Sequence, residues 1–235
     1  MIRNIIFLLV FYLGLIFFLI LFIPALILPK YLVVLGGKIL GYWTLFCLKF
    51  IMTTKIEVKG IENILNNQKY FVVCSHQSIF ETFFLQTIFN NSVFILKKEL
   101  IKIPLFGLYL KKLGCISINR DKISKENIGF SEEVGKVINN SDKTLIIFPQ
   151  GTRKNYDDRS KFKKGFSRIY KDFKIACLPV AINSGRVWPK TGNLIPNQKI
   201  TVSILSLIPP GMEQDKLAFE VEQNIYNELN KISKD

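Results

Sequence analysis

The alternation of apolar and polar positions divides the chain into an apolar N-terminal part and a globular remainder. The run Asn4–Pro29 contains no charged residue, and its length suits a membrane-spanning helix, which needs about 20 apolar residues. A second apolar stretch, Tyr31–Met52, is interrupted by Lys38 and Lys49. The pattern predicts a membrane anchor over residues 1–52. The anchor would be either a helical hairpin dipping into one leaflet, or one spanning helix followed by an interfacial one.

A secretory signal peptide is the competing interpretation of the first apolar run. Its apolar core would span about 7–15 residues and would precede small residues at a cleavage site. The run here is longer and more aromatic, and no such site stands out in the sequence. The sequence therefore favours a retained membrane anchor.

After Thr53 short strand-like runs alternate with helical ones, which is typical of an α/β domain over residues 53–235. Strands are predicted at Lys55–Lys59, Tyr70–Ser75, Ser92–Leu96, Cys115–Asn119, Thr144–Phe148, Ile175–Ile182 and Lys199–Ile208. Helices are predicted at Phe80–Phe89, Lys125–Asn139, Gly165–Phe173 and Asp215–Leu229. The last of these carries apolar residues at four-residue spacing, as an amphipathic helix does.

Composition narrows the choice of partners. The chain has 32 basic and 18 acidic residues, a net charge of +14, which attracts nucleic acid, anionic lipid headgroups or phosphorylated substrates. Beside an apolar N-terminus the membrane surface is the more natural partner, and no nucleic-acid recognition motif accompanies the lysines. A single histidine and four scattered cysteines leave no basis for a zinc site. We therefore expect no metal, and interpret the cysteines as buried thiols of a protein facing the cytosol.

The single histidine, His76, comes two positions after the apolar run Tyr70–Cys74, and Glu81 follows five positions later. Strand ends direct side chains into the crevice where open α/β sheets bind ligands. There the carboxylate could fix the tautomer of the imidazole while the imidazole takes a proton from a hydroxyl. The alternative is a core histidine beside an unrelated glutamate that favours the helix dipole, and this pair alone leaves both interpretations open.

Two further candidate segments also follow buried strands. Arg120 closes the run that begins at Gly114, and a guanidinium there would present a planar fork suited to phosphate. The run Phe148–Arg153 follows the strand Thr144–Ile147. Its glycine lets backbone amides approach an anion, its threonine adds a hydroxyl and its arginine a charge. A strand-ending arginine and a Pro-Gly turn on a basic surface are the alternatives.

Two later features complete the pattern. Lys161, Lys163 and Lys164 place positive charge beside the helix that begins near Gly165, and helix N-termini favour anions. The buried strand further on contains Pro179, which predicts an edge strand or a bulge.

Together these segments resemble the glycerolipid acyltransferase family, specifically the 1-acyl-glycerol-3-phosphate acyltransferases. The family's first motif is a histidine and an acidic residue separated by four positions, here His76 and Glu81. The second motif ends in an arginine after a glycine-initiated strand, here Gly114–Arg120. The third reads Phe-Pro-Glu-Gly-Thr-Arg, here Phe148–Arg153, and the fourth is a short apolar stretch with proline, here Leu178–Val180.

Two positions depart from the family pattern. Aspartate is usual where Glu81 stands, and glutamate keeps its charge with one more methylene. Gln150 replaces the family's glutamate and removes a charge. A neutral amide still hydrogen-bonds a substrate hydroxyl, so the change puts a charge-dependent role of this position in doubt and leaves room for a different acceptor.

The resemblance implies an α/β fold with a mixed, mostly parallel sheet flanked by helices, joined to the N-terminal anchor. It implies acyl transfer, without a cofactor, from acyl-CoA or acyl carrier protein to the sn-2 hydroxyl of lysophosphatidic acid, forming phosphatidic acid in phospholipid biosynthesis. In this scheme His76 is the base and Glu81 orients it. The acceptor phosphate would bind Arg120, Gly151, Thr152 and Arg153, with Gln150 and Lys163 as further possible acceptor contacts.

The expected location is a membrane, of the bacterial inner-membrane type, with the site on the cytoplasmic side where activated acyl thioesters are made. Two alternatives remain open. One is a related acyltransferase with another acceptor, such as glycerol-3-phosphate, another lysophospholipid or a lipid A precursor. The other is a non-catalytic lipid-binding protein of the same fold, which Gln150 would suit.

Overall fold

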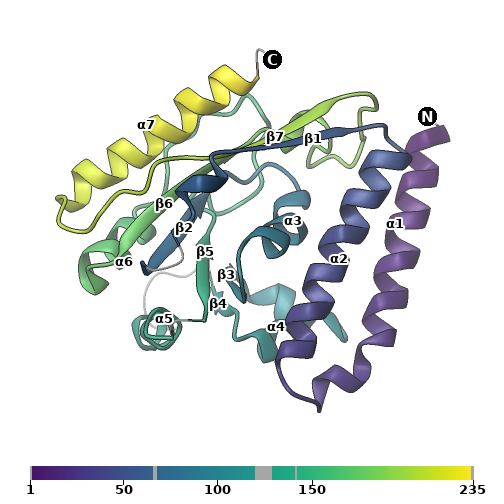
Figure 1. Ribbon diagram of the computed structural model, residues 1–235, viewed down its shortest axis with the longest axis horizontal. Coiled ribbons are helices and arrows are strands. Elements are labelled where there is room, and N and C mark those ends of the chain that lie inside the picture. The colour runs from purple at the N-terminus through teal and green to yellow at the C-terminus, as the bar shows by residue number, and fades with distance from the viewer. Residues whose placement is uncertain (1, 66–67, 120–128, 141, 234–235) are drawn as a thin grey trace. The chain divides into compact units, whose positions relative to one another are not determined.

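The computed structural model describes residues 2–65, 68–119, 129–140 and 142–233, and the chain forms two compact units (Figure 1). The first unit comprises Met1–Met52 and Thr82–Leu145, and the second comprises Thr53–Glu81 and Ile146–Asp235. The N-terminal helices therefore belong to the same unit as the middle of the chain.

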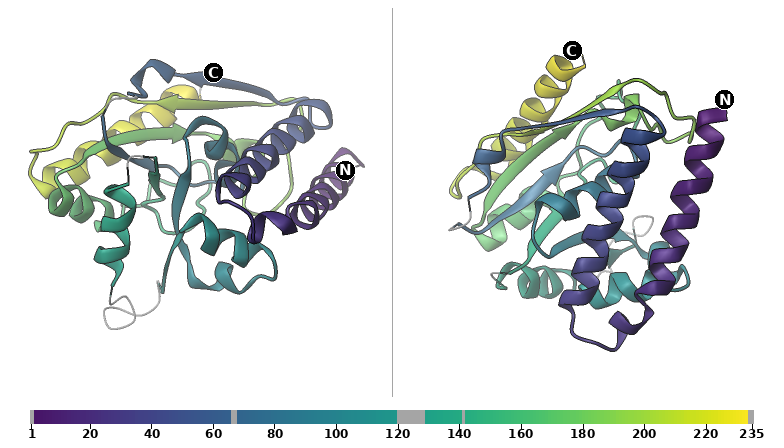
Figure 2. Two further views of the ribbon diagram at one scale, coloured as in Figure 1. Left: turned by 60° about the horizontal axis from the view of Figure 1, so that its bottom comes forward. Right: turned by 45° about the vertical axis from the view of Figure 1, so that its right-hand side comes forward.

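The first unit is mostly helical. Its elements are α1 (Ile2–Leu21), the 3-10 helix η1 (Ile23–Leu26), α2 (Tyr31–Phe50), all but the start of α3 (Phe80–Ile88), β3 (Ser92–Lys97), η3 (Lys98–Lys102), α4 (Phe106–Leu113), β4 (Ile116–Ile118) and α5 (Phe130–Ile138). The strands β3 and β4 pair in parallel. The helices α1 and α2 lie side by side as a hairpin (Figure 2).

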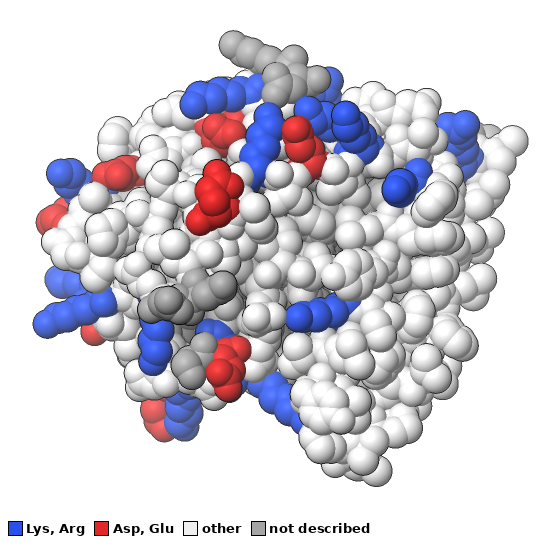
Figure 3. All heavy atoms as spheres, in the orientation of Figure 1, with Lys and Arg blue, Asp and Glu red and all other residues white. Residues whose placement is uncertain are grey.

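The two helices of the hairpin differ in what they bury. Along α1 only Phe7 and Phe11 are buried, and residues such as Leu13 and Phe17 stay exposed. Figure 3 shows the surface on the side of α1 and α2 to be almost free of charged side chains. Both helices are long and apolar enough to cross a membrane by length and composition.

The helix α2 packs closely against α3. A Cβ atom at Gly37 would lie 2.1 Å from Oε1 of Gln86, and one at Gly41 would lie 2.7 Å from the backbone oxygen of Phe83. Such distances leave no room for a side chain, so the glycines allow the two helices to touch. One face of α2 is thus buried within its own unit.

Two details of this unit differ from the sequence-based expectation. The helix α4 was not predicted, and it occupies a segment that had been assigned no element. The helix predicted over Lys125–Asn139 begins at Phe130, because Gly129 adopts a left-handed φ of 89° that interrupts a right-handed helix.

The second unit is built on a sheet with the strand order β1 (Lys55–Lys59), β7 (Lys199–Ile204), β6 (Ala176–Ile182), β2 (Tyr70–Cys74) and β5 (Thr144–Ile147), of which β5 runs in from the first unit. All neighbouring pairs are parallel except β6 with β7. The short 3-10 helices η2 (Ile61–Asn63) and η5 (Ser184–Arg186) and the helices α6 (Gly165–Phe173) and α7 (Gln214–Ile232) complete it. The helix α7 packs on β6 and α6. The predicted fold class, a mixed, mostly parallel sheet flanked by helices, is confirmed.

The proline of the fourth motif lies in the middle of this sheet. Pro179 pairs with Val73 of β2 on one side. On the other side the ladder with β7 ends at Val180–Ile204 and resumes as a bridge between Cys177 and Ile208. Between these two pairs, three residues after β7 lie opposite two residues of β6, which is a bulge. Of the two predicted arrangements for the proline, the structure therefore has the bulge, whereas β6 is not an edge strand.

Candidate active site

The candidate site lies in the second unit, at the carboxyl ends of its parallel strands. The strands β2, β5 and β6 are neighbours and run in the same direction. Their ends therefore bring three loops together, which begin at Ser75, Phe148 and Asn183. Carboxyl ends of strands are where open α/β sheets bind ligands.

The backbone of His76 is held by the loop of the third motif. Its N–H donates to Oε1 of Gln150 at 2.9 Å, and its carbonyl accepts from the N–H of Lys154 at 2.8 Å. Its ring stacks on that of Phe148, with centroids 4.0 Å apart and planes 15° from parallel. The structure thus brings the first and third motifs into contact, and the backbone and ring of His76 are both held by the loop after β5.

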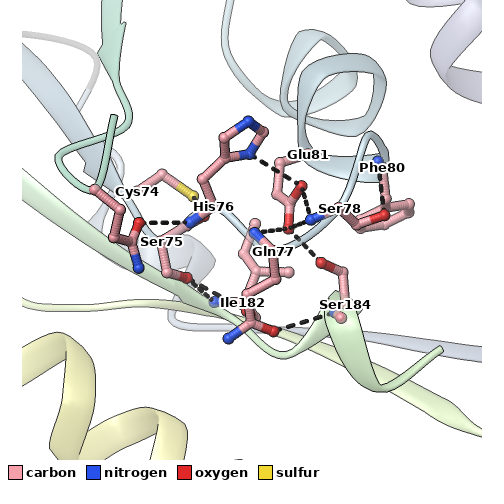
Figure 4. A network of polar contacts seen from close by, with 11 residues as sticks. Cys74, Ser75, His76, Gln77, Ser78, Phe80, Glu81, Ile182 and Ser184 are labelled. Carbon is pink, nitrogen blue, oxygen red and sulfur yellow. Dashed lines mark hydrogen bonds and ion pairs between the residues drawn. The ribbon is translucent and has the colours of Figure 1, made fainter. Parts of the chain in front are cut away.

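The side chains of His76 and Glu81 face each other. The Nδ1 atom lies 3.5 Å from Oε2 of Glu81, with the histidine side chain 15% exposed and the carboxylate fully buried. Figure 4 shows Nδ1 directed toward Glu81 and the other ring nitrogen directed away. A distance of 3.5 Å is an ion-pair distance rather than a hydrogen bond, and contacts of this kind often tighten when substrate binds. A carboxylate facing Nδ1 favours the tautomer with its proton there, which leaves Nε2 as the proton acceptor.

The carboxylate of Glu81 is stabilised by the start of α3. It accepts the N–H of Gln77 at 3.2 Å and the N–H of Ser78 at 3.1 and 3.0 Å. Backbone amides at a helix N-terminus stabilise a negative charge. Burial, together with the charge of Glu81, raises the pKa of the neighbouring Cys74 thiol, so this thiol stays protonated and unreactive. Cys47, Cys74 and Cys177 are buried, as predicted, whereas Cys115 is partly exposed.

The loop after β5 brings a lysine over its glycine. Gly151 has a left-handed φ of 73°, and a Cβ atom there would lie 3.1 Å from Nζ of Lys163. The lysine backbone N–H donates to the carbonyl of Pro149 at 3.0 Å. Thr152 is exposed and Arg153 is half-buried. Among the described residues the side chains of Arg153 and Lys163 have no ion-pair partner, so both cations are available to an anion.

Gln150 is buried, and both ends of its amide are bonded within the protein. Its oxygen accepts from His76, and its side chain hydrogen-bonds the hydroxyl of Tyr226 on α7. Burial first and the charge of Glu222 second raise the pKa of Tyr226 to about 12, whereas the hydrogen bond from Gln150 opposes this rise. The structure thus gives Gln150 a role in holding His76. The other predicted phosphate ligand, Arg120, lies outside the described residues.

Sequence reasoning missed two residues of the site, one that contacts Glu81 and one that contacts Gln150. Ser184 donates its hydroxyl hydrogen bond to Oε1 of Glu81, although it lies 103 residues further along the chain. Tyr226 reaches the site from the C-terminal helix. Neither residue stands in a local pattern that marks it. In the described part of the chain no three His, Cys, Asp or Glu side chains gather as a metal site would require.

A histidine whose Nδ1 faces a buried carboxylate, at the carboxyl ends of parallel strands, is the arrangement of an enzyme that uses a general base. The chain belongs to the acyltransferase family, whose sequence profile matches residues 55–183. This match covers the loops after β2 and β5, including His76, Glu81 and Gln150.

Individual relatives and one solved structure agree with the family. The chain is 34% identical over 140 residues to the 1-acyl-sn-glycerol-3-phosphate acyltransferase of Pseudomonas aeruginosa, covering 59% of this chain and 53% of the relative. It is 29% identical over 194 residues to the enzyme of the same name from Cocos nucifera, covering 79% of this chain and 60% of the relative. The chain thus spans between half and two thirds of these curated relatives. The crystal structure of the LPA acyltransferase PlsC from Thermotoga maritima has the same fold, with a TM-score of 0.81, 23% identity, and coverage of 99% of this chain and 97% of that one.

Proposed function

We propose that this protein transfers a fatty acyl group from an acyl thioester to the sn-2 hydroxyl of 1-acyl-glycerol-3-phosphate, forming phosphatidic acid. The observation that carries the proposal is the pairing of His76 Nδ1 with the buried carboxylate of Glu81 at 3.5 Å. The names of the relatives from Pseudomonas aeruginosa and Cocos nucifera support the acceptor. The donor is acyl-CoA or acyl carrier protein, and no cofactor takes part.

In the proposed mechanism Nε2 of His76 removes the proton of the acceptor hydroxyl while Glu81 stabilises the imidazolium. The oxygen attacks the thioester carbonyl, the tetrahedral adduct collapses, and His76 returns its proton to the leaving thiolate. Because both substrates are held together, the transfer is direct and needs no acyl-enzyme. The stack on Phe148 and the two backbone hydrogen bonds of His76 keep the ring in place through both proton transfers.

The acceptor phosphate is proposed to bind next to the backbone of Gly151. Arg153 and Lys163 offer charge there, the Gly151 backbone permits close approach, and the exposed hydroxyl of Thr152 can donate. Arg120 is assigned to the same phosphate on the family motif alone. Gln150 supports the site through His76 rather than through the substrate, because its amide is already bonded at both ends.

The acyl chain is proposed to enter an apolar cavity of the first unit. The cavity is lined mostly by apolar side chains, as ligand pockets are. Its wall comes from the hairpin, α3 and α4, and includes Phe22, Gly36, Phe83 and Tyr109.

The N-terminal hairpin is proposed to lie in one leaflet of the membrane, on the cytoplasmic side. The helix α2 buries a face that includes Val33, Gly37, Gly41 and Leu48, so it is packed within the first unit rather than surrounded by lipid. The exposed apolar face of α1 suits an interfacial helix. A hairpin in one leaflet is therefore favoured over a spanning helix.

The test is acyl transfer by detergent-purified protein from labelled oleoyl- and palmitoyl-CoA or acyl carrier protein to lysophosphatidic acid. General-base catalysis typically contributes about 10²–10⁴-fold, so His76→Ala should lose most turnover while keeping the melting temperature of the wild type. The same assay tests other acceptors in parallel with lysophosphatidic acid: glycerol-3-phosphate, other lysophospholipids and a lipid A precursor. Faster transfer to one of these would reassign the acceptor, and no transfer from either donor to any acceptor would refute the proposal.

A further inference from the structure

The carboxylate of Glu81 is surrounded by hydrogen-bond donors that treat its two oxygens differently. Oε1 accepts from the N–H of Gln77, the N–H of Ser78 and the hydroxyl of Ser184. Oε2 accepts only from the N–H of Ser78 among these donors, and it is the oxygen that faces His76. Figure 4 shows these contacts converging on Glu81 from its own loop and from the loop after β6.

Among the residues that the structure describes, Ser184 is the one donor to Oε1 that comes from outside the loop of Glu81 itself. Ser184 and Glu81 are both fully buried, so no water replaces the hydroxyl if it is removed. The two N–H donors belong to the loop that leads into α3, and the hydroxyl reaches Oε1 from the loop after β6.

The position of Ser184 does not depend on its hydroxyl. The hydroxyl of Ser75 accepts from the N–H of Ile182 at 2.9 Å, and the side-chain oxygen of Gln77 accepts from the N–H of Gly185 at 3.1 Å. The loop that carries Ser184 is therefore joined to the loop of His76 on both sides of the serine. A change of Ser184 to alanine should leave the backbone where it is and remove only the donor to Glu81.

We propose that Ser184 is a positioning residue, which orients the Glu81 carboxylate so that Oε2 faces Nδ1 of His76 and selects the Nδ1–H tautomer. The proposal rests on the proposed function, in which Nε2 is the base. It assigns to a residue outside the four family motifs a part in the proton transfer. Its effect must pass through Glu81, because Ser184 contacts the carboxylate and not the imidazole.

The kinetic test compares Ser184→Ala with the wild type and with Ser92→Ala, a matched removal of a buried hydroxyl that bonds only a backbone carbonyl. We expect Ser184→Ala to lower kcat by about 10- to 100-fold, as small misplacements of reacting groups do, with little change in KM. In a Glu81→Gln background the same change should cost less than about twofold, because the charged group it orients is gone. An equal loss in both backgrounds would show a merely structural role and overturn the proposal.

A second measurement requires no turnover. His76 is the only histidine of the chain, so histidine-selective ¹⁵N labelling gives one imidazole whose two nitrogen shifts report the tautomer. The wild type and Ser92→Ala should show Nδ1–H, and Ser184→Ala should shift the population toward Nε2–H. Ser184→Cys, which keeps the volume but has a weak donor, should shift it in the same direction and serves if the alanine variant does not fold. An unchanged tautomer in the folded variants would overturn the proposed role of Ser184, whether or not the wild type transfers an acyl group. A lack of acyl transfer by the wild type would count only against the proposed function.

Discussion

The replacement Gln150→Glu restores the residue of the family motif, and the structure predicts that it destabilises this protein. The amide of Gln150 accepts from the His76 N–H at 2.9 Å and hydrogen-bonds the hydroxyl of Tyr226. That hydroxyl already donates to the carbonyl of Ser160, so it must accept from the Gln150 NH₂ group. Only a side chain with one acceptor and one donor serves both partners.

A carboxylate at position 150 has acceptors only. It can still accept from the His76 N–H, but the hydroxyl of Tyr226 must then lose its donor or turn away from the carbonyl of Ser160. One buried polar group is left without a partner in either case, which costs about 1–3 kcal/mol. The charge of Glu222, which already acts on Tyr226, adds repulsion of the same sign.

The assay is urea unfolding of Gln150→Glu beside the wild type, repeated across pH. Burial should raise the folded-state pKa of the new carboxyl above its unfolded value of about 4.3. The folded protein then binds the proton more tightly, so the penalty should be absent below about pH 4 and should grow as the pH rises. The catalytic rate should change by only a few-fold, because the contact with His76 survives.

Tyr226→Phe provides the matched control. It removes the hydroxyl that conflicts with a carboxylate, so Gln150→Glu should cost measurably less in the Tyr226→Phe background than alone. Gln150→Met should instead lower kcat more than Gln150→Glu, since it leaves the buried His76 N–H without an acceptor. If Gln150→Glu is as stable as the wild type at pH 8, the assignment of the amide to Tyr226 is wrong.

Three further predictions follow from the site and the hairpin. Gly151→Ala should cost about 1–2 kcal/mol of stability because of its left-handed backbone, and it should raise the KM for the phosphorylated acceptor by displacing Lys163. The control Gly192→Ala, with a φ of 83° and open space around it, should lose stability at unchanged KM. Equal KM values for the two variants would remove Lys163 from the phosphate site. Phe17→Glu, on the exposed face of α1, should reduce flotation of the protein with anionic lipid vesicles, while its activity on detergent-dispersed substrate should be unchanged. Undiminished flotation would count against membrane contact by that face. Desolvation of its thiol raises the pKa of Cys115 to about 11, so iodoacetamide at pH 8 should modify it roughly 100-fold more slowly than free cysteine. A rate like that of free cysteine would contradict this raised pKa.

Local sequence determined most of the elements, and the failures have a tertiary cause. The strands β2, β5 and β6 were recognisable as short apolar runs between turn signals. The helix α4 was not, because its eight residues contain Gly107 and follow Pro104. It is held in place by distant contacts: the hydroxyl of Tyr109 donates to the carbonyl of Leu19 at 2.7 Å, and the ammonium of Lys112 donates to the carbonyl of Leu26 at 2.8 Å. A short helix of this kind depends on its packing more than on its own propensity.

The candidate site divides in the same way. The pair His76 and Glu81 could be proposed from the sequence, because five residues at the start of a helix bring the two side chains together by local geometry alone. The partners that hold them could not, since Gln150 is 74 residues away and Ser184 is 103 residues away. The parallel pairing of β2 with β5 and with β6 decides these contacts, because it brings the ends of three strands to one edge of the sheet. The sequence by itself thus indicated the candidate pair, and the tertiary structure decided which buried donors and acceptors fix that pair in position.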